Sequence, residues 1–306
     1  MTADLATDVG GMQLANPVLV ASGCFASGAE IDRFYDVTEL GAIICKSVTL
    51  EPREGLPTPR MAETPSGMLN AIGLQNPGID RWLAKDLPWL ADRGAAVVAS
   101  IAGTSVDEYR QLARKLRGAN GVVGIEVNIS CPNVEDRGTV FACRADPAGA
   151  AIDAVVRESS VPVFAKLTAD VTDIVEIATA VIRAGAAGVS LINTVLGMAI
   201  DIDTGRPKLA NVVGGLSGPA IRPIAVRAVH QVHQAMPQVP IIGMGGIGGA
   251  EDALEFVYAG ATAIAVGTGN FVNPFAALDV CRGLGAWLDA RGLAGLSELR
   301  GTVKLP

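Results

Sequence analysis

The stretch NISCPN, residues 128–133, places polar side chains at the end of the apolar run GVVGIEV. One of these residues is Cys131, whose thiol can lose its proton and then accept one from a substrate. The alternative is an ordinary exit from a buried strand, with Cys131 as a small half-buried residue. The other polar groups of the chain distinguish a catalytic Cys131 from an ordinary strand exit, because a proton acceptor needs neighbours that hold a substrate beside it.

Two lysines, Lys46 and Lys166, end apolar runs of the kind that form buried strands. A buried ammonium without a partner is costly, so each lysine should face an anion or a carbonyl group. One such lysine could simply extend its side chain to the rim of the protein. Two together favour a binding site, because buried charges are rare.

Two later apolar runs end in glycine, within MGGIG (244–248) and VGTGN (266–270). Glycine lets backbone N–H groups approach an anion closely, and a helical pattern follows each run. A tight turn would explain one such ending. Two of them favour a cofactor that carries phosphate.

Histidine is scarce in this chain. His230 and His233 are its two histidines and lie three residues apart in one predicted helix, far in sequence from every strand end. We expect them on an exposed helix face, so the Cys131 thiol becomes the next candidate for a general base. The other four cysteines (24, 45, 143 and 281) show no metal or disulfide spacing, which indicates reduced thiols and no bound metal.

Short apolar runs rich in β-branched residues must position these side chains. Their unbroken apolar character is typical of parallel strands covered on both faces. The eight runs are 18–23, 41–49, 95–103, 121–130, 161–167, 187–194, 240–246 and 261–269. Apolar residues spaced three and four apart predict helices over 106–118, 147–160, 173–185, 220–236, 250–260 and 274–288.

This alternation predicts an α/β fold, a single (β/α)8 TIM barrel over residues 1–306, with its active site at the C-terminal face of the strands. Two doubly wound halves are the main competitor, but no linker rich in Pro, Ser or charge divides the chain. Segments 50–78 and 195–218 exceed normal loop length and should lie over the C-terminal face.

The charge pattern excludes some partners. The chain has 24 basic and 31 acidic residues with no Lys/Arg cluster, which argues against nucleic acid as a partner.

No run reaches eighteen apolar residues and the N-terminus lacks the features of a signal peptide. We therefore expect no membrane span and a cytoplasmic location.

Several segments resemble dihydroorotate dehydrogenases. They are NISCPN, GAIICKSVTLEPREGLPTPR (41–60) and IIGMGGIGGAEDALEFVYAGA (241–261), the last being similar to the family's flavin-phosphate signature. Segments 70–78 and 193–223 resemble the class 1B catalytic subunit in particular. Class 2 members carry an N-terminal membrane-binding extension and a serine base, whereas Cys131 stands at the base position here. The resemblance covers nearly the whole chain.

The resemblance implies FMN-dependent oxidation of (S)-dihydroorotate to orotate in de novo pyrimidine (UMP) biosynthesis. Cys131 would remove a proton from C5 while C6 gives hydride to flavin N5. FMN would contact Ser22, Lys46, Ser47, Ser100, Asn128, Lys166, Ile192, Gly218, Gly245, Gly246, Gly267 and Thr268. Substrate would contact Lys46, Asn70, Ala71, Ile72, Gly73, Leu74, Asn128, Asn193 and Thr194. A cation and several asparagines suit a carboxylate-bearing ring of amides, because asparagine both donates and accepts.

Two residues depart from the family pattern. Leu56 stands where the family usually has Asn or His, and Ser100 stands where an Asn commonly contacts flavin. Serine is shorter and keeps one hydroxyl, so the contact from Ser100 is the one placed in doubt.

Class 1B membership also implies partners. An electron-transfer subunit with FAD and a [2Fe–2S] cluster would pass electrons to NAD+, in a heterotetramer of two catalytic and two electron-transfer chains. This chain has no cysteine set for a cluster and no GxGxxG opening a βαβ unit, consistent with those groups lying on another chain. We also expect a homodimer of this chain, by family resemblance.

Two alternatives stay open. A class 1A-like enzyme would use the same fold and flavin with fumarate and no partner, and segment 193–223 argues against it. A non-catalytic barrel that binds a phosphate ligand would be colourless, and the two lysines with NISCPN argue against that.

Overall fold

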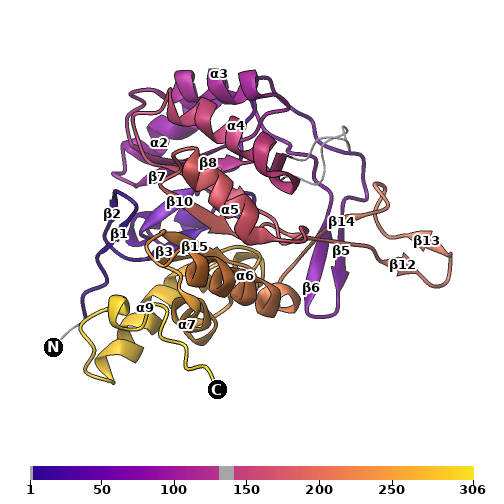
Figure 1. Cartoon of the computed structure of the whole chain (residues 1–306). Helices are drawn as coiled ribbons and strands as arrows, with labels where there is room; N and C mark the ends of the chain where they lie inside the picture. The colour runs from indigo at the N-terminus through magenta and orange to yellow at the C-terminus, as the bar shows by residue number, and fades with distance from the viewer. Residues whose placement is uncertain (1–2, 131–140) are drawn as a thin grey trace.

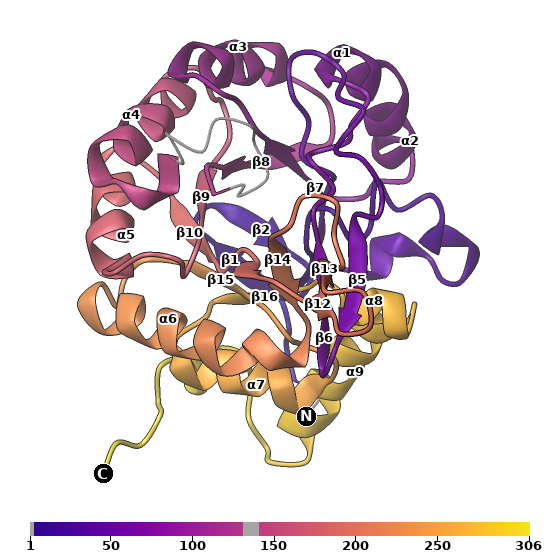
Figure 2. The same ribbon diagram turned by 90° about the vertical axis from the view of Figure 1, so that its right-hand side faces the viewer.

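A computed structural model describes residues 3–130 and 141–306 of the chain. Its centre is a closed barrel of eight parallel strands, in the order β10-β15-β16-β3-β4-β7-β8-β9 (Figure 2). The strands are β3 (Val18–Val20), β4 (Ala42–Ile44), β7 (Val97–Ile101), β8 (Val122–Asn128), β9 (Val163–Leu167), β10 (Gly188–Leu191), β15 (Ile241–Met244) and β16 (Ala263–Val266). Each lies within one of the eight predicted runs, so the predicted barrel is confirmed.

Alternate residues of these strands fill the barrel interior. Leu19, Ile44, Val98 and Phe164 belong to one buried cluster there, together with small alanines of β16. An N-terminal hairpin, β1 (Thr7–Val9) and β2 (Met12–Leu14), adds apolar side chains to the same cluster. The lower barrel is therefore a packed core, which leaves the C-terminal end for the polar residues.

Helices surround the barrel (Figure 2). Six of them match the predicted helices: α3 (Val106–Leu116), α4 (Ala145–Val156), α5 (Ile174–Arg183), α6 (Arg222–Ala235), α7 (Ala250–Ala259) and α9 (Ala276–Asp289). The first connection differs, because two 3₁₀ turns, Ile31–Arg33 and Val37–Glu39, replace a helix between β3 and β4.

The connection before β7 contains helical structure that the sequence pattern did not predict. It holds α1 (Ile79–Arg81), a π-helical turn and α2 (Leu87–Ala91), and the short α8 (Gly269–Val272) follows β16. Pro88 lies in the first turn of α2 and has no amide hydrogen to donate, which is compatible with the break in the helical pattern.

The two long segments pair with each other over the C-terminal end of the barrel (Figure 1). They form a four-stranded sheet of β11 (Val195–Gly197), β14 (Gly214–Ser217), β6 (Gly67–Asn70) and β5 (Met61–Thr64), in that order. The small hairpin of β12 (Ile200–Asp201) and β13 (Arg206–Pro207) projects beyond this sheet. The predicted position of both segments is confirmed, whereas their mutual pairing was not predicted.

The histidines correct one expectation. His230 and His233 of α6 are half-buried rather than exposed. A side chain at Gly301 would meet the His233 ring, with Nε2 2.1 Å from an added Cβ, so the C-terminal segment packs against this histidine. Arg300 next to it donates to the carbonyls of Gly260 and Val239.

Acid should weaken this part of the protein. Burial is the main cause that lowers the pKa of His233, with Arg300 and His230 adding to it. Below pH about 6.5 the unfolded chain binds a proton that the folded chain resists, so stability falls as pH drops and is unaffected above that range. Denaturant unfolding between pH 7.5 and pH 5 should show a smaller pH slope for His233→Gln than for wild type. Equal slopes would contradict the prediction.

Candidate active site

A cavity of about 270 Å³ lies between the C-terminal end of the barrel and the four-stranded sheet. Most residues predicted to bind cofactor or substrate line it, although they come from many separate elements. From the cofactor set these are Ser22, Lys46, Ser47, Asn128, Lys166, Ile192, Gly218, Gly245, Gly246, Gly267 and Thr268. From the substrate set they are Asn70, Ile72, Gly73, Leu74, Asn193 and Thr194, with Lys46 and Asn128 common to both sets.

Three predicted residues stand apart. Cys131 lies outside the described residues. Ser100 is buried below the cavity, where its Oγ lies 2.8 Å from the Ser47 Oγ. Ala71 is fully buried and belongs to a cluster with Leu69 and Leu209 under the sheet. Ser100 thus reaches the cavity through Ser47, and Ala71 supports the strand that carries Asn70.

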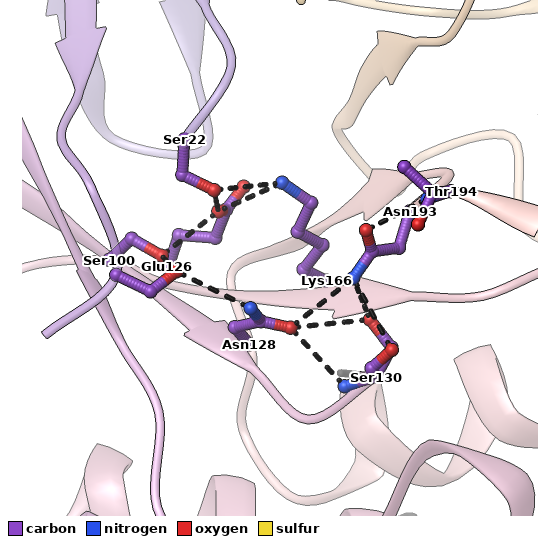
Figure 3. Close-up of polar contacts among 9 residues, drawn as sticks. Ser22, Ser100, Glu126, Asn128, Ser130, Lys166, Asn193 and Thr194 are labelled. Atoms are coloured by element: carbon purple, nitrogen blue, oxygen red, sulfur yellow. Dashed lines mark hydrogen bonds and ion pairs between the residues drawn. The ribbon is translucent and has the colours of Figure 1, made fainter. Parts of the chain in front are cut away.

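A buried ion pair lies at the cavity floor. The Lys166 ammonium on β9 donates to Ser22 Oγ at 3.0 Å and to the Glu126 carboxylate on β8 at 3.4 Å (Figure 3). The exposed fraction of the side chain is 5% for Lys166 and 1% for Glu126. The same carboxylate oxygen accepts from Ser22 and Ser100. The expected anionic partner of Lys166 is therefore confirmed.

Glu126 itself was missed in the sequence. It sits between Ile125 and Val127 in a run that otherwise reads as a buried strand, and its inward position follows from the alternation of β8. A carboxylate in such a run indicates a cation on a neighbouring strand, because a buried carboxylate needs a partner. In the parallel pair of β8 and β9, the residue directly opposite Lys166 is Asn128 and not Glu126. The ion pair between Glu126 and Lys166 is therefore diagonal and depends on the geometry of the barrel.

An amide and hydroxyl network forms one wall of the cavity (Figure 3). Asn193 Nδ2 donates to Ser130 Oγ at 2.9 Å and lies 3.4 Å from Asn128 Oδ1. Asn128 Nδ2 donates to Ser47 Oγ at 3.3 Å, and Tyr109 of α3 donates to the Asn128 carbonyl at 2.9 Å. These bonds hold the two asparagines in place, and Ser130 directly precedes the predicted base.

The glycine ending of β15 forms a cradle. Gly245 and Gly246 have φ of +127° and +72°, a region that favours glycine. A Cβ on Gly246 would lie 2.8 Å from the Gly218 carbonyl and 2.9 Å from Arg222 Cβ, so no larger residue fits. Both glycines and Gly267 face the cavity. This close backbone approach fits a phosphate group, which main-chain N–H groups can bind.

The predicted substrate stretch 70–74 is anchored by a residue outside it. Asn76 is buried, and its amide donates to the Leu74 carbonyl at 2.7 Å and to Thr49 Oγ1 at 2.9 Å. Its Oδ1 accepts from the Thr49 and Gly78 amides. Asn76 therefore ties this stretch to the chain after β4, near Lys46.

Cys24 also lines the cavity, although the sequence suggested only a loop residue. Burial raises the pKa of its thiol to about 11, and the nearby Lys166 and Lys46 lower it by less. The thiol is therefore neutral at physiological pH, and it is a poor proton acceptor.

The family model for dihydroorotate dehydrogenase matches residues 4–288. The chain belongs to the dihydroorotate dehydrogenase family. It is similar to proteins named dihydroorotate dehydrogenase B (NAD(+)), catalytic subunit. These include one from Geobacillus kaustophilus, 53% identical over 97% of this chain and 95% of that protein, and one from Anoxybacillus flavithermus, 51% identical over the same shares. A third, from Bacillus caldolyticus, is 52% identical over 97% and 95%.

The described residues also bear on membrane and metal sites. Among residues 3–130 and 141–306, no helix has the length and apolar character needed to span a bilayer. Within the same ranges, His, Cys, Asp and Glu side chains form no group able to hold a metal ion.

Proposed function

We propose that this chain is the catalytic subunit of an FMN-dependent dihydroorotate dehydrogenase. It oxidises (S)-dihydroorotate to orotate in de novo pyrimidine biosynthesis, in the cytoplasm. The observation that carries the proposal is one cavity that combines a glycine cradle, a charge-paired lysine and three asparagines, Asn70, Asn128 and Asn193. Family membership and the names of the relatives support the same activity.

The described residues have distinct parts in this proposal. The backbone around Gly245, Gly246 and Gly267 would hold the FMN phosphate, and Lys166 would place its charge against the flavin ring. Lys46 would bind the substrate carboxylate, and the asparagines would donate to and accept from its ring amides. FMN, when bound, supplies the acceptor for the hydride that leaves C6.

We propose that Cys131 is the base that removes the proton from C5 of the substrate. The Cys24 thiol is the other candidate near the cavity, and its pKa of about 11 leaves it protonated. Ser130 immediately precedes Cys131 in the sequence and accepts a hydrogen bond from Asn193, which lines the cavity and which we assign to the substrate.

Electrons would leave this chain for NAD+ through a separate subunit that carries FAD and a [2Fe–2S] cluster. The words "catalytic subunit" and "NAD(+)" in the relatives' names support such a partner. We further propose a homodimer of this chain within a heterotetramer of two catalytic and two electron-transfer subunits.

The first test is the visible spectrum of this chain, purified alone, before and after dihydroorotate is added without oxygen. We expect a yellow protein whose flavin band near 450 nm bleaches, while NAD+ stays inert until a partner subunit is added. A yellow protein that does not bleach would contradict the substrate, and a protein that binds no FMN would contradict the cofactor. Rapid turnover with fumarate by the chain alone would instead support the class 1A-like alternative.

A further inference from the structure

An acidic residue outside the cavity holds the glycine loop that follows β15. Asp252 lies in the first turn of α7, and its Oδ2 accepts from the Gly248 amide at 2.9 Å and from the Gly249 amide at 3.1 Å. The loop begins with Gly245 and Gly246, which face the cavity. Asp252 thus fixes the far end of the cradle to a helix.

An arginine from the preceding helix completes this support. Arg222, the first residue of α6, pairs through Nη1 with the other oxygen of Asp252 and lies 3.5 Å from the Gly246 carbonyl. Its Nε lies 3.2 Å from the Glu255 carboxylate. Exposed fractions of 29% for Arg222 and 25% for Asp252 show that the pair is partly shielded from water. The arginine therefore connects α6, α7 and the cradle.

The loop needs such support because it is almost all glycine. Four of the five residues that follow Met244, at positions 245, 246, 248 and 249, are glycine, and glycine loses more backbone freedom on ordering than any other residue. A loop that must be ordered by the ligand itself binds that ligand more weakly than a loop ordered beforehand. Bonds from Asp252 and Arg222 supply this order without touching the cavity.

The pair also balances charge. The Asp252 carboxylate alone would repel an anion in the cradle, and the Arg222 guanidinium, which also pairs with Glu255, offsets part of that repulsion. Loss of Arg222 would leave the carboxylate uncompensated beside the loop. Loss of both groups would remove the repulsion together with the support.

We propose that Arg222 and Asp252 are positioning residues that order the glycine loop for the phosphate end of the cofactor. The inference rests on the proposed FMN site and deepens it. It predicts an effect on the phosphate and not on the ring, which a general role in folding would not produce.

The test compares FMN with riboflavin, which lacks the phosphate, by fluorescence titration of the protein freed of flavin. Arg222→Met and Asp252→Asn should each weaken FMN binding about tenfold or more, while riboflavin affinity changes by less than about threefold. The double variant should bind FMN no more weakly than Arg222→Met, because the two residues act together. Arg227→Met, an exposed arginine of the same helix, is the matched control and should bind both ligands as wild type does.

Each result decides the matter. Equal losses for FMN and riboflavin would mean a general disturbance of the cavity and would overturn the inference, as would unchanged FMN affinity in both single variants. Wild-type protein that binds neither flavin would instead contradict the proposed function itself. Salt offers a further check. If salt weakens FMN binding in Asp252→Asn but not in Arg227→Met, the inference gains support, since the attraction that remains for the phosphate would then come from exposed charge, which salt screens.

Discussion

Replacing Glu126 with leucine is expected to lower the free energy of unfolding by about 3–5 kcal/mol, because it strands the Lys166 ammonium inside the barrel. The ammonium and carboxylate lie 3.4 Å apart and are almost fully buried. With about 2.1 cal/mol/K of unfolding entropy per residue, this loss corresponds to roughly 5–8 °C in Tm for 306 residues. Thermal unfolding of the flavin-free protein measures it directly.

The double variant Glu126→Leu/Lys166→Met separates charge from packing. It removes both buried charges, so it should be more stable than either single variant. Asp153→Asn breaks an exposed pair between Asp153 of α4 and Arg157, the residue after this helix, and should change stability little. Two results would refute this account of the ion pair. One is a Glu126→Leu protein as stable as wild type, and the other is a double variant whose loss of unfolding free energy equals the sum of the losses in the two single variants.

Replacing Cys131 with alanine is expected to slow flavin reduction by dihydroorotate by about 10²–10⁴-fold, the usual contribution of a general base. FMN content and orotate binding should persist, since Lys166, Asn128 and Asn193 remain in the cavity. Stopped-flow measurement of flavin bleaching without oxygen isolates this step from electron transfer to a partner.

Cys143→Ala is the matched control, because Cys143 is an exposed cysteine in a 3₁₀ turn, three residues after position 140, where the segment outside the described residues ends. It should reduce flavin at the wild-type rate. Unchanged flavin reduction in Cys131→Ala at every pH would show that this thiol is not the base. An equal loss in both variants would point to disturbance of the segment instead of loss of a base.

Local sequence patterns were sufficient for the elements that bury apolar side chains. Each barrel strand lies in a mostly apolar run, and six helices show apolar residues spaced three and four apart, because burial against the sheet requires these patterns. The connection around Pro88 was missed, since its interrupted helical pattern lacks the periodicity on which the prediction relies. The half-burial of His233 was missed because Gly260 and Gly301, which pack against it, are distant in sequence.

Local sequence patterns specify the barrel, the side of the barrel that carries the polar residues, and the types of groups gathered there. Strand ends in a closed parallel barrel share one rim, so residues such as Lys46, Asn128 and Gly245 had to meet once the strands were recognised. Three contacts emerge only in the folded chain: Glu126 neutralises Lys166, the two long segments form one sheet, and Arg222 and Asp252 support the glycine loop. The first two contacts depend on how strands distant in sequence pair, and the third joins α6 and α7 to the loop between them; no local period encodes any of these contacts.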